Sequence, residues 1–402
     1  MGDWRRSTWG KEISLEYGKG LRGYSSSEGS VRVYGANGPV GWTTTPLAPG
    51  PGIILGRKGA YRGVNFSKAP FSVIDTAYYI LLKGELDMRW AYYAIIYYQL
   101  GKIDDGSPIP STTRSAVYVR ELNIPPLAEQ RAIASILGAL DDKIDLNRRM
   151  NETLEAIARV IFKDWFVDFG PTQAKIEGRA PYFAQDIWDL FPALLDDEGK
   201  PTGWRKGTLA DISTLNPESW SERNAPDRIN YVDLANTKWG TIENIVMYEW
   251  CDAPSRARRI LRPGDTIVGT VRPGNGSYSF INGSDLTGST GFAVLRPDNQ
   301  QQKSIVYCAV TSPDNIQRLT LLADGGAYPA VRPEIVASTG LILSTSQIFL
   351  EFSRLVDPLL MRVESNKAEN ETLTQTRDFL LPKLMSGEIR VKDVEKIVGE
   401  AS

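Results

Sequence analysis

Apolar side chains recur at alternating intervals of three and four residues along the middle of the chain, a pattern that predicts a helix packed against another helix. Between residues 133 and 168 such a helix would be roughly 50 Å long. Seven of nine positions in the series are apolar: Leu137, Leu140, Ile144, Asn147, Asn151, Leu154, Ala158, Ile161 and Trp165. The two central asparagines weaken packing but can fix register and partner choice.

The series returns 219 residues later, where the sequence NETL of residues 151–154 recurs at 370–373. Both asparagines keep their places in the second series: Val356, Leu359, Val363, Asn366, Asn370, Leu373, Arg377, Leu380 and Leu384. The chain therefore contains two related long helices. Pro358 falls inside the second one, where proline is expected to break or kink a helix.

The duplication extends to the segments before each helix. Each copy opens with Trp-x-Lys, at residues 9–11 and 204–206, and Leu47-Ala48-Pro49-Gly50 resembles Leu261-Arg262-Pro263-Gly264. Short runs of Val, Ile and Tyr alternate with turns rich in Gly, Pro, Asn and Ser, and one helical run lies near residues 87–100. The second copy carries insertions, mainly between Trp204 and Leu261.

The predicted fold class is α+β, with two similar α+β domains separated by two long helices that form an antiparallel coiled coil in an internal pseudo-two-fold repeat. Duplex DNA also has two-fold symmetry, so two such domains could read two half-sites with a gap between them. The predicted boundaries are 1–124 for the first domain, 125–168 for the first helix, 169–202 for a linker with a short helix, 203–342 for the second domain, 343–390 for the second helix and 391–402 for a tail.

Composition narrows the possible chemistry. Histidine is absent, which excludes His-based triads and His-ligated metals but not carboxylate chemistry. The two cysteines fit a reducing cytoplasm. The N-terminus lacks an apolar run typical of a signal peptide, and the most apolar patch, residues 90–101, is too short to span a membrane. We therefore expect a cytoplasmic protein without a membrane partner.

Charge is distributed unevenly although the net charge is −2. Residues 1–120 contain 15 Lys and Arg against 9 Asp and Glu, whereas residues 204–337 contain 14 of each. The surplus base in the first domain is compatible with phosphate contact. Random scatter of charge is the alternative interpretation.

The segment LNIPPLAEQ at residues 122–130, with the helix that follows and the run GPGIILGRKGAYRGV at 50–64, resembles the specificity subunit of type I restriction–modification enzymes. The resemblance covers essentially the whole chain. It implies two target-recognition domains that each read half of a bipartite site in double-stranded DNA. It also implies helices that set the spacer length and dock two methyltransferase subunits, with motor–nuclease subunits in the full complex. This chain would itself be non-catalytic and hold no cofactor, while S-adenosylmethionine, ATP and Mg are expected on the partner subunits.

Besides Pro358, the second copy departs from the family pattern at two further places. Residues 344–349 read STSQIF where the first copy reads PPLAEQ, and Arg377 occupies a seam position. We therefore expect the two partner-docking surfaces to be unequal.

The loop GRKGAYRG at residues 56–63 is the best candidate for DNA contact, because glycines allow close approach and the basic side chains can meet phosphates or guanine edges. Its counterpart is RPGNGSYS at 272–279, and STTR (111–114) and AYPAVR (327–332) occupy matching places in the two copies. A solvated hairpin tip and a plain Asn-Gly turn are the alternatives. The candidate DNA-binding residues are Arg57, Lys58, Tyr61, Arg62, Arg114, Arg272, Asn275, Ser277, Tyr278, Tyr328 and Arg332.

Catalytic motifs are missing from the sequence. We find neither the Asn/Asp-Pro-Pro-Tyr/Phe motif of adenine methyltransferases nor a G-x-x-x-x-G-K-[ST] phosphate loop, and no metal site is predicted. Asp141-Asp142-Lys143 has the Asp-x-Lys spacing of many nucleases but no upstream Pro-Asp partner, so we interpret it as a solvated helix face. A nuclease that uses the carboxylates near Asp141, and a protein scaffold without a DNA role, are the competing hypotheses.

Overall fold

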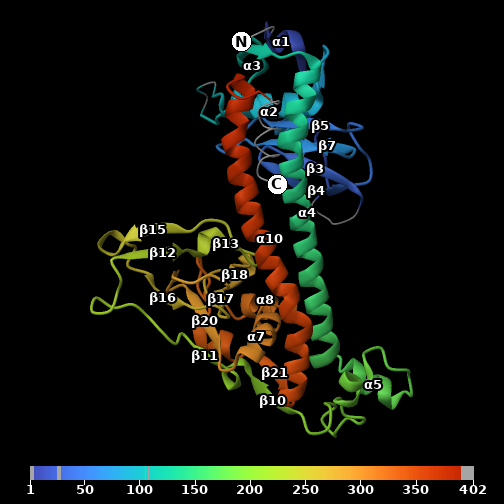
Figure 1. Ribbon diagram of the computed structural model, residues 1–402, viewed down its shortest axis with the longest axis vertical. Helices are drawn as coiled ribbons and strands as arrows, with labels where there is room; N and C mark the ends of the chain where they lie inside the picture. Colours follow the sequence, from blue (N-terminus) through green and yellow to red (C-terminus); the bar gives the residue numbers. More distant parts are fainter. Residues whose placement is uncertain (1–3, 25–28, 105, 107, 391–402) are drawn as a thin grey trace. The chain divides into compact units, whose positions relative to one another are not determined.

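The computed structural model describes residues 4–24, 29–104, 106 and 108–390, so the predicted tail at 391–402 lies outside the described residues. Contacts divide the chain into two compact units (Figure 1). Unit 1 comprises Met1–Asp145 with Asn370–Ser402, and unit 2 comprises Leu146–Glu369. No helix among the described residues is long and apolar enough to cross a membrane.

Two long helices contribute to both units. Helix α4 covers Leu127–Phe166 and therefore begins earlier than the predicted start near residue 133. Helix α10 covers Ser346–Ser386. Within unit 2 they run antiparallel, because Asn147 contacts Glu369 near one end and the ring of Trp165 lies 5.9 Å from that of Phe352 near the other.

The expectation that Pro358 breaks the second helix is wrong, since α10 is continuous through it. Proline removes the hydrogen bond that residue 358 would donate to the carbonyl of Arg354. Both residues are exposed, so water can reach the carbonyl that lacks a partner. The apolar side chains of Val356 and Leu360 beside the proline are buried and hold the helix in the core of unit 2.

Unit 1 is built from short strands with their apolar residues turned inward. One sheet has the order β2-β8-β5-β6, a second has the order β4-β3-β7, and β1 pairs antiparallel with β9. The strand bounds are Arg5–Thr8 (β1), Ile13–Tyr17 (β2), Val31–Gly35 (β3), Gly38–Thr43 (β4), Gly52–Gly56 (β5), Val64–Ser67 (β6), Phe71–Val73 (β7), Ala77–Leu82 (β8) and Glu121–Ile124 (β9). The helices other than α4 and α10 are Trp9–Glu12 (α1), Met88–Tyr97 (α2), Leu100–Lys102 (η1) and Arg114–Tyr118 (α3).

Unit 2 repeats this plan. Its sheets have the orders β11-β20-β17-β18 and β15-β12-β19-β16, and β10 pairs with β21. In both units the second sheet contains one parallel pair, β3 with β7 and β12 with β19. The strand bounds are Arg205–Thr208 (β10), Ser213–Leu215 (β11), Arg228–Val232 (β12), Val246–Glu249 (β15), Ala257–Leu261 (β16), Thr266–Gly269 (β17), Tyr278–Phe280 (β18), Leu286–Ser289 (β19), Phe292–Pro297 (β20) and Gly340–Leu343 (β21).

The predicted insertion in the second copy contains a two-stranded hairpin, Thr237–Lys238 (β13) and Thr241–Ile242 (β14). The helices of unit 2 other than α4 and α10 are Gly170–Ile176 (α5), Gln185–Asp189 (α6), Leu209–Asp211 (η2), Leu234–Asn236 (η3), Trp250–Asp252 (η4), Pro273–Asn275 (η5), Gln300–Gln302 (η6), Lys303–Val310 (α7), Pro313–Leu321 (α8) and Pro333–Ala337 (α9). The predicted α+β class with an internal repeat is thus confirmed.

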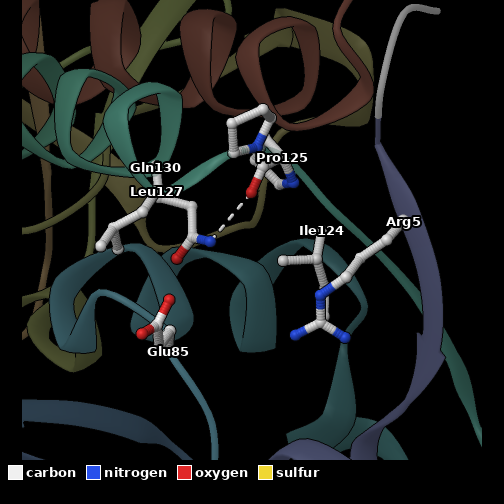
Figure 2. A pocket seen from close by; sticks show the side chains of 7 residues that line it. Arg5, Glu85, Ile124, Pro125, Leu127 and Gln130 are labelled. Atoms are coloured by element: carbon white, nitrogen blue, oxygen red, sulfur yellow. Dashed lines mark hydrogen bonds between the residues drawn. The ribbon is translucent and has the colours of Figure 1, made fainter.

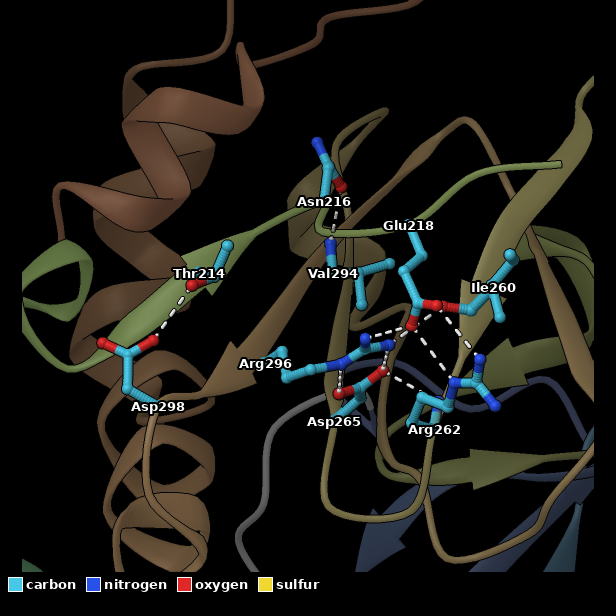
Figure 3. A network of polar contacts seen from close by, with 9 residues as sticks. All are labelled: Thr214, Asn216, Glu218, Ile260, Arg262, Asp265, Val294, Arg296 and Asp298. Carbon is cyan, nitrogen blue, oxygen red and sulfur yellow. Dashed lines mark hydrogen bonds and ion pairs between the residues drawn. The ribbon is translucent and has the colours of Figure 1, made fainter. Parts of the chain in front are cut away.

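An ion-pair network ties the strands of unit 2 together (Figure 3). The guanidinium of Arg296, on β20, donates two hydrogen bonds of 2.9 Å to the buried carboxylate of Asp265 and also pairs with Glu218. Arg262 donates to both oxygens of Glu218 at 3.0 and 3.1 Å. The network therefore joins the segment after β11 to the β16–β17 connection and to β20.

This network predicts that unit 2 is sensitive to acid. Hydrogen bonds from Arg262 and then Arg296 lower the pKa of Glu218 from 4.5 to about 2. Because the folded pKa is below the unfolded one, this stabilisation is fully present above about pH 4.5 and is lost as the pH falls towards 2. We expect Glu218→Gln to melt at a lower temperature than wild type at pH 7, with the difference shrinking as pH falls from 5 to 3. Thermal unfolding across this range, with the exposed Glu222→Gln as control, measures the effect; a constant difference would contradict it.

Candidate nucleic-acid interface

Two segments of unit 1 that are distant in sequence form one surface. The loop after β5 runs from Arg57 towards β6, and it is tied by backbone hydrogen bonds to the segment before α3. The amide of Gly59 donates to the carbonyl of Pro110 at 3.0 Å, and the amide of Thr112 donates to the carbonyl of Arg57 at 2.8 Å. The two candidate DNA-contact segments of the first copy therefore lie side by side.

Unit 2 repeats this junction bond for bond. The amide of Arg272 donates to the carbonyl of Pro329 at 2.7 Å, and the amide of Val331 donates to the carbonyl of Thr270 at 2.9 Å. A bridge between Val271 and Ala330 matches the one between residues 58 and 111. The duplication inferred from sequence is thus preserved in the hydrogen bonds of the candidate surface.

An aromatic ring stands between two arginines on the surface of unit 1. The Cζ atoms of Arg57 and Arg114 lie 4.7 and 4.2 Å from the ring centroid of Tyr17, at the end of β2. Cation–π attraction holds both guanidinium groups in place. Arg57 also donates to the carbonyl of Asp75 at 3.2 Å, and Arg114 lies 3.6 Å from a carboxylate oxygen of Glu16. Tyr17 was not predicted, because only strand pairing brings it to the two loops.

Arg62 differs from its neighbours. Its guanidinium donates to the carbonyls of Gly59, Gly101 and Ile103 at 2.8 to 3.2 Å, so it shapes the loop from within. Lys58 is exposed, and Tyr61 is 79 % exposed at the loop tip. Of the predicted contact residues in unit 1, Arg57, Lys58, Tyr61 and Arg114 therefore remain accessible to a ligand.

The predicted residues of unit 2 divide into two groups. Arg272, Asn275, Tyr328 and Arg332 are exposed, and the Cζ atom of Arg272 lies 4.6 Å from the ring centroid of Tyr328. Arg272 also donates to the carbonyl of Ala327 at 2.6 Å.

Ser277 and Tyr278 are buried, which corrects the expectation that they face DNA. The hydroxyl of Ser277 donates to the carbonyl of Leu234 at 3.2 Å, and Tyr278 begins strand β18 with its ring inside the core. The sequence at 272–279 is interpreted as one loop because its glycines predict a turn, whereas strand β18 begins directly after that turn.

The seam asparagines pair with the opposite helix in unit 2. The side-chain amide of Asn366 donates to the side-chain oxygen of Asn151 at 2.7 Å, and that of Asn147 donates to Glu369 at 2.8 Å. Asn147 and Asn366 have no exposed surface. The other predicted seam positions are buried or half-buried: Leu140, Ile144, Leu154, Ile161, Val363, Asn370, Leu373 and Leu380.

The two aspartates considered for nuclease chemistry are committed to ion pairs inside unit 1. Asp141 accepts hydrogen bonds from the hydroxyl of Tyr93 at 2.6 Å and from Arg377 at 2.9 Å. Asp142 pairs with Arg89 and with Lys68, and the hydrogen bonds from Arg89 lower its pKa to about 2. The interpretation as a solvated helix face was therefore wrong, because helix α2 and the end of α10 cover this side of α4. Within the described ranges no group of three His, Cys, Asp or Glu could hold a metal ion.

A pocket of about 360 Å³ lies at the start of α4 in unit 1 (Figure 2). One of its lining residues, Gln130, is buried and ties the helix start to α2. Its side chain donates to the carbonyl of Pro125 at 2.9 Å and accepts from the amide of Asp87 at 2.8 Å. The position 219 residues later is Phe349, which is buried in the core of unit 2. The Pro-Pro-Leu-Ala-Glu-Gln signature thus marks a polar junction that the second copy replaces with apolar packing.

Comparison with known proteins agrees with this architecture. Residues 29–156 match the model of the type I restriction modification DNA specificity domain. The chain is 26 % identical over 336 residues to the type I restriction enzyme HindI specificity subunit of Haemophilus influenzae, covering 70 % of this chain and 71 % of that protein. It is also 26 % identical over 306 residues to the MjaIX specificity subunit of Methanocaldococcus jannaschii, covering 73 % of this chain and 66 % of that protein.

A solved structure shares the fold. The crystal structure of a type I restriction–modification S subunit from M. genitalium superimposes with a TM-score of 0.57 at 19 % identity, covering 95 % of this chain and 96 % of that one. The chain is thus similar to type I specificity subunits in sequence over most of its length and in fold.

Proposed function

We propose that this chain, a relative of type I specificity subunits, is a non-catalytic DNA-recognition subunit in which each unit reads one half of a bipartite site. The observation that carries the proposal is the repeated loop junction. The same backbone hydrogen bonds in both units present different exposed side chains on an equivalent surface. A duplicated frame with divergent contacts is suited to reading two unlike half-sites.

The exposed side chains are of the kinds that read DNA. Unit 1 offers Arg57 and Arg114 against an aromatic ring and the exposed Lys58 beside Arg57 in sequence, and arginine and lysine pair best with guanine edges or phosphates. Unit 2 offers Arg272 and Asn275, and asparagine is suited to bidentate contact with adenine. The two half-sites are therefore proposed to differ in base composition.

Helix α4 offers a surface for a partner beside the seam. Leu146, Ile157, Val160 and Val167 are exposed, although α4 already buries another face. With the half-buried Met150, they lie one position before successive seam places, at intervals of four, seven, three and seven residues. Thr153 and Asp164 occupy the two places between, and Val167 is one residue beyond the end of α4. An exposed apolar stripe of this kind typically marks a protein interface.

We propose that a methyltransferase subunit packs on this stripe. The full complex is proposed to hold two such subunits together with motor–nuclease subunits. S-adenosylmethionine, ATP and Mg would be bound by these partners, whereas this chain supplies the DNA contacts and sets the spacing between half-sites.

The proposal is tested by expressing the chain with its methyltransferase partner in a methylation-free host and sequencing the DNA with modification-sensitive reads. A new motif of two short half-sites around a fixed gap supports it. A soluble assembled complex that yields no motif would refute it.

The arginines of unit 1 are expected to carry affinity for the first half-site. Removing one base or phosphate contact costs about 1–3 kcal/mol, so Arg57→Ala combined with Arg114→Ala should weaken binding to a duplex with the methylated motif by about a hundredfold. Fluorescence anisotropy at fixed salt measures this loss. The exposed Arg120→Ala, beyond the end of α3, is the matched control. Equal affinities of all three proteins would exclude this surface as a contact.

A further inference from the structure

The tip of the β13–β14 hairpin in unit 2 holds a tryptophan in an unusual backbone conformation. The two-residue turn is Trp239-Gly240, and both residues have positive φ, at 48° and 85°. Such a turn favours Asn-Gly, Asp-Gly or Gly-Gly, because left-handed φ brings the Cβ atom of other residues too close to the backbone. A bulky residue in this conformation is an outlier that needs a compensating reason.

Burial does not supply that reason. The side chain of Trp239 is 57 % exposed, and its ring meets Tyr278 edge-on at 6.0 Å. Phe169 also has a left-handed backbone, but its half-buried ring packs against Trp204. The hairpin therefore keeps a strained residue whose indole largely faces solvent.

The turn is held rigidly. The amide of Trp239 donates to the carbonyl of Gly276 at 2.6 Å, and the amide of Gly240 donates to the carbonyl of Tyr278 at 2.9 Å. The carbonyl of Gly240 accepts from the hydroxyl of Ser279 at 2.9 Å and from the ammonium of Lys367 at 2.6 Å. Four hydrogen bonds thus fix the position from which the indole projects, as a recognition contact requires.

The indole lies against the candidate DNA-contact loop of unit 2. A Cβ atom at Gly276 would come within 2.5 Å of the indole ring, so only glycine fits beneath it. Gly276 follows the exposed Asn275 and ends the short η5 turn that begins after Arg272. The indole, the asparagine and the arginine therefore belong to one continuous surface.

We propose that Trp239 is a specificity-determining residue of unit 2, whose indole makes the apolar contact to a base of the second half-site. The inference rests on the proposed function. An exposed aromatic ring can make apolar contact with the methyl group of thymine in the major groove, a contact for which the charged Arg272 and the polar Asn275 are poorly suited. Backbone strain at the tip is then retained because recognition needs the ring at this position.

Trp239→Asn tests the proposal, because asparagine is favoured by the turn but lacks the ring. We expect the purified chain to melt at the wild-type temperature or above it. Affinity for a duplex with the methylated motif should fall about tenfold, the loss expected when one good base contact is removed. The methylome should show a second half-site relaxed at one or more positions and an unchanged first half-site. Trp239→Phe keeps an aromatic ring and should retain the wild-type motif.

Met247→Asn, which removes another exposed apolar side chain from unit 2, is the control and should change neither affinity nor motif. The inference is overturned if Trp239→Asn keeps wild-type affinity and motif. It is also overturned if that variant melts at a lower temperature, because the indole would then be a packing residue. Failure of the wild-type complex to produce a bipartite motif would instead refute the proposed function, so the two failures are distinguishable.

Discussion

Replacing Asp141 with asparagine is expected to lower the free energy of unfolding of unit 1 by about 2 kcal/mol, within the range for losing a hydrogen bond between charged groups. The change removes one of the two carboxylates that bind the guanidinium of Arg377, which also donates to Asp378 at 2.8 and 2.9 Å, and it weakens the acceptor of the Tyr93 hydroxyl. The loss stays below that for breaking an isolated buried ion pair, because Asp378 remains and because the side chains of Asp141 and Arg377 keep 20 % and 29 % of their surface exposed. Hydrogen exchange of amides in α2 measures the loss.

The chain itself suggests the rescue of this variant. The positions 219 residues from Asp141 and Arg377 are Leu360 and Ala158, and both are buried in unit 2. Apolar replacement of a whole buried pair is often neutral or stabilising. We therefore expect Asp141→Leu combined with Arg377→Met to recover most of the lost stability once Tyr93→Phe also removes the buried hydroxyl that would lose its acceptor. Glu371→Gln, at an exposed position on α10, is the control. If Asp141→Asn were as stable as this control, the pair of Asp141 and Arg377 would contribute little to stability.

Trp165→Ala should destabilise unit 2 by about 3–5 kcal/mol, the range for truncating a fully buried aromatic side chain. The indole is inaccessible to solvent and lies 4.8 Å from the ring of Phe191, 5.3 Å from Phe183 and 5.9 Å from Phe352. The cavity left by alanine would open between α4, α10 and the segment that follows α4.

Hydrogen exchange of the amides in residues 183–204 reports this loss most directly, because Phe183 and Phe191 in this segment pack against the indole. Trp165→Phe should cost less, since it leaves a smaller void. Val167 is exposed and lies two residues after Trp165. The free energy of unfolding of Val167→Ala should therefore stay within about 0.5 kcal/mol of wild type. Equal protection in Trp165→Ala and Val167→Ala would contradict the assigned packing.

The packing of Phe183 and Phe191 against Trp165 shows that the predicted linker at residues 169–202 is part of the core of unit 2. Residues 169–202 are rich in Pro, Gly and Asp, which suggested a connecting segment with a short helix. The segment contains two helices, α5 and α6, and buries Trp188 and Phe191. A composition rich in Pro, Gly and Asp predicts turns in such a segment. It does not predict which distant residues its few aromatic side chains pack against.

The candidate DNA-contact surface could likewise be predicted from sequence only in part. The loops at 56–63 and 327–332 could be found from sequence, because glycine, basic and aromatic residues recur at matched places in the two copies. The side chains that face outward could not. Ser277 and Tyr278 are buried in unit 2, where Tyr278 begins a strand. The guanidinium of Arg62 donates to backbone carbonyls of Gly101 and Ile103, so it is not available for DNA. Both outcomes depend on segments that are distant in sequence.

The sequence by itself determined the two long helices, their asparagine-bearing seam and the duplication, because helical periodicity and internal repetition are properties of positions along one chain. Tertiary structure alone decided that Tyr17 stands between two arginines, that Asp141 binds partners on α2 and α10, and that a strained Trp239 projects beside Asn275. Each of these depends on contacts between residues that are far apart in sequence, and local patterns carry no information about those distances.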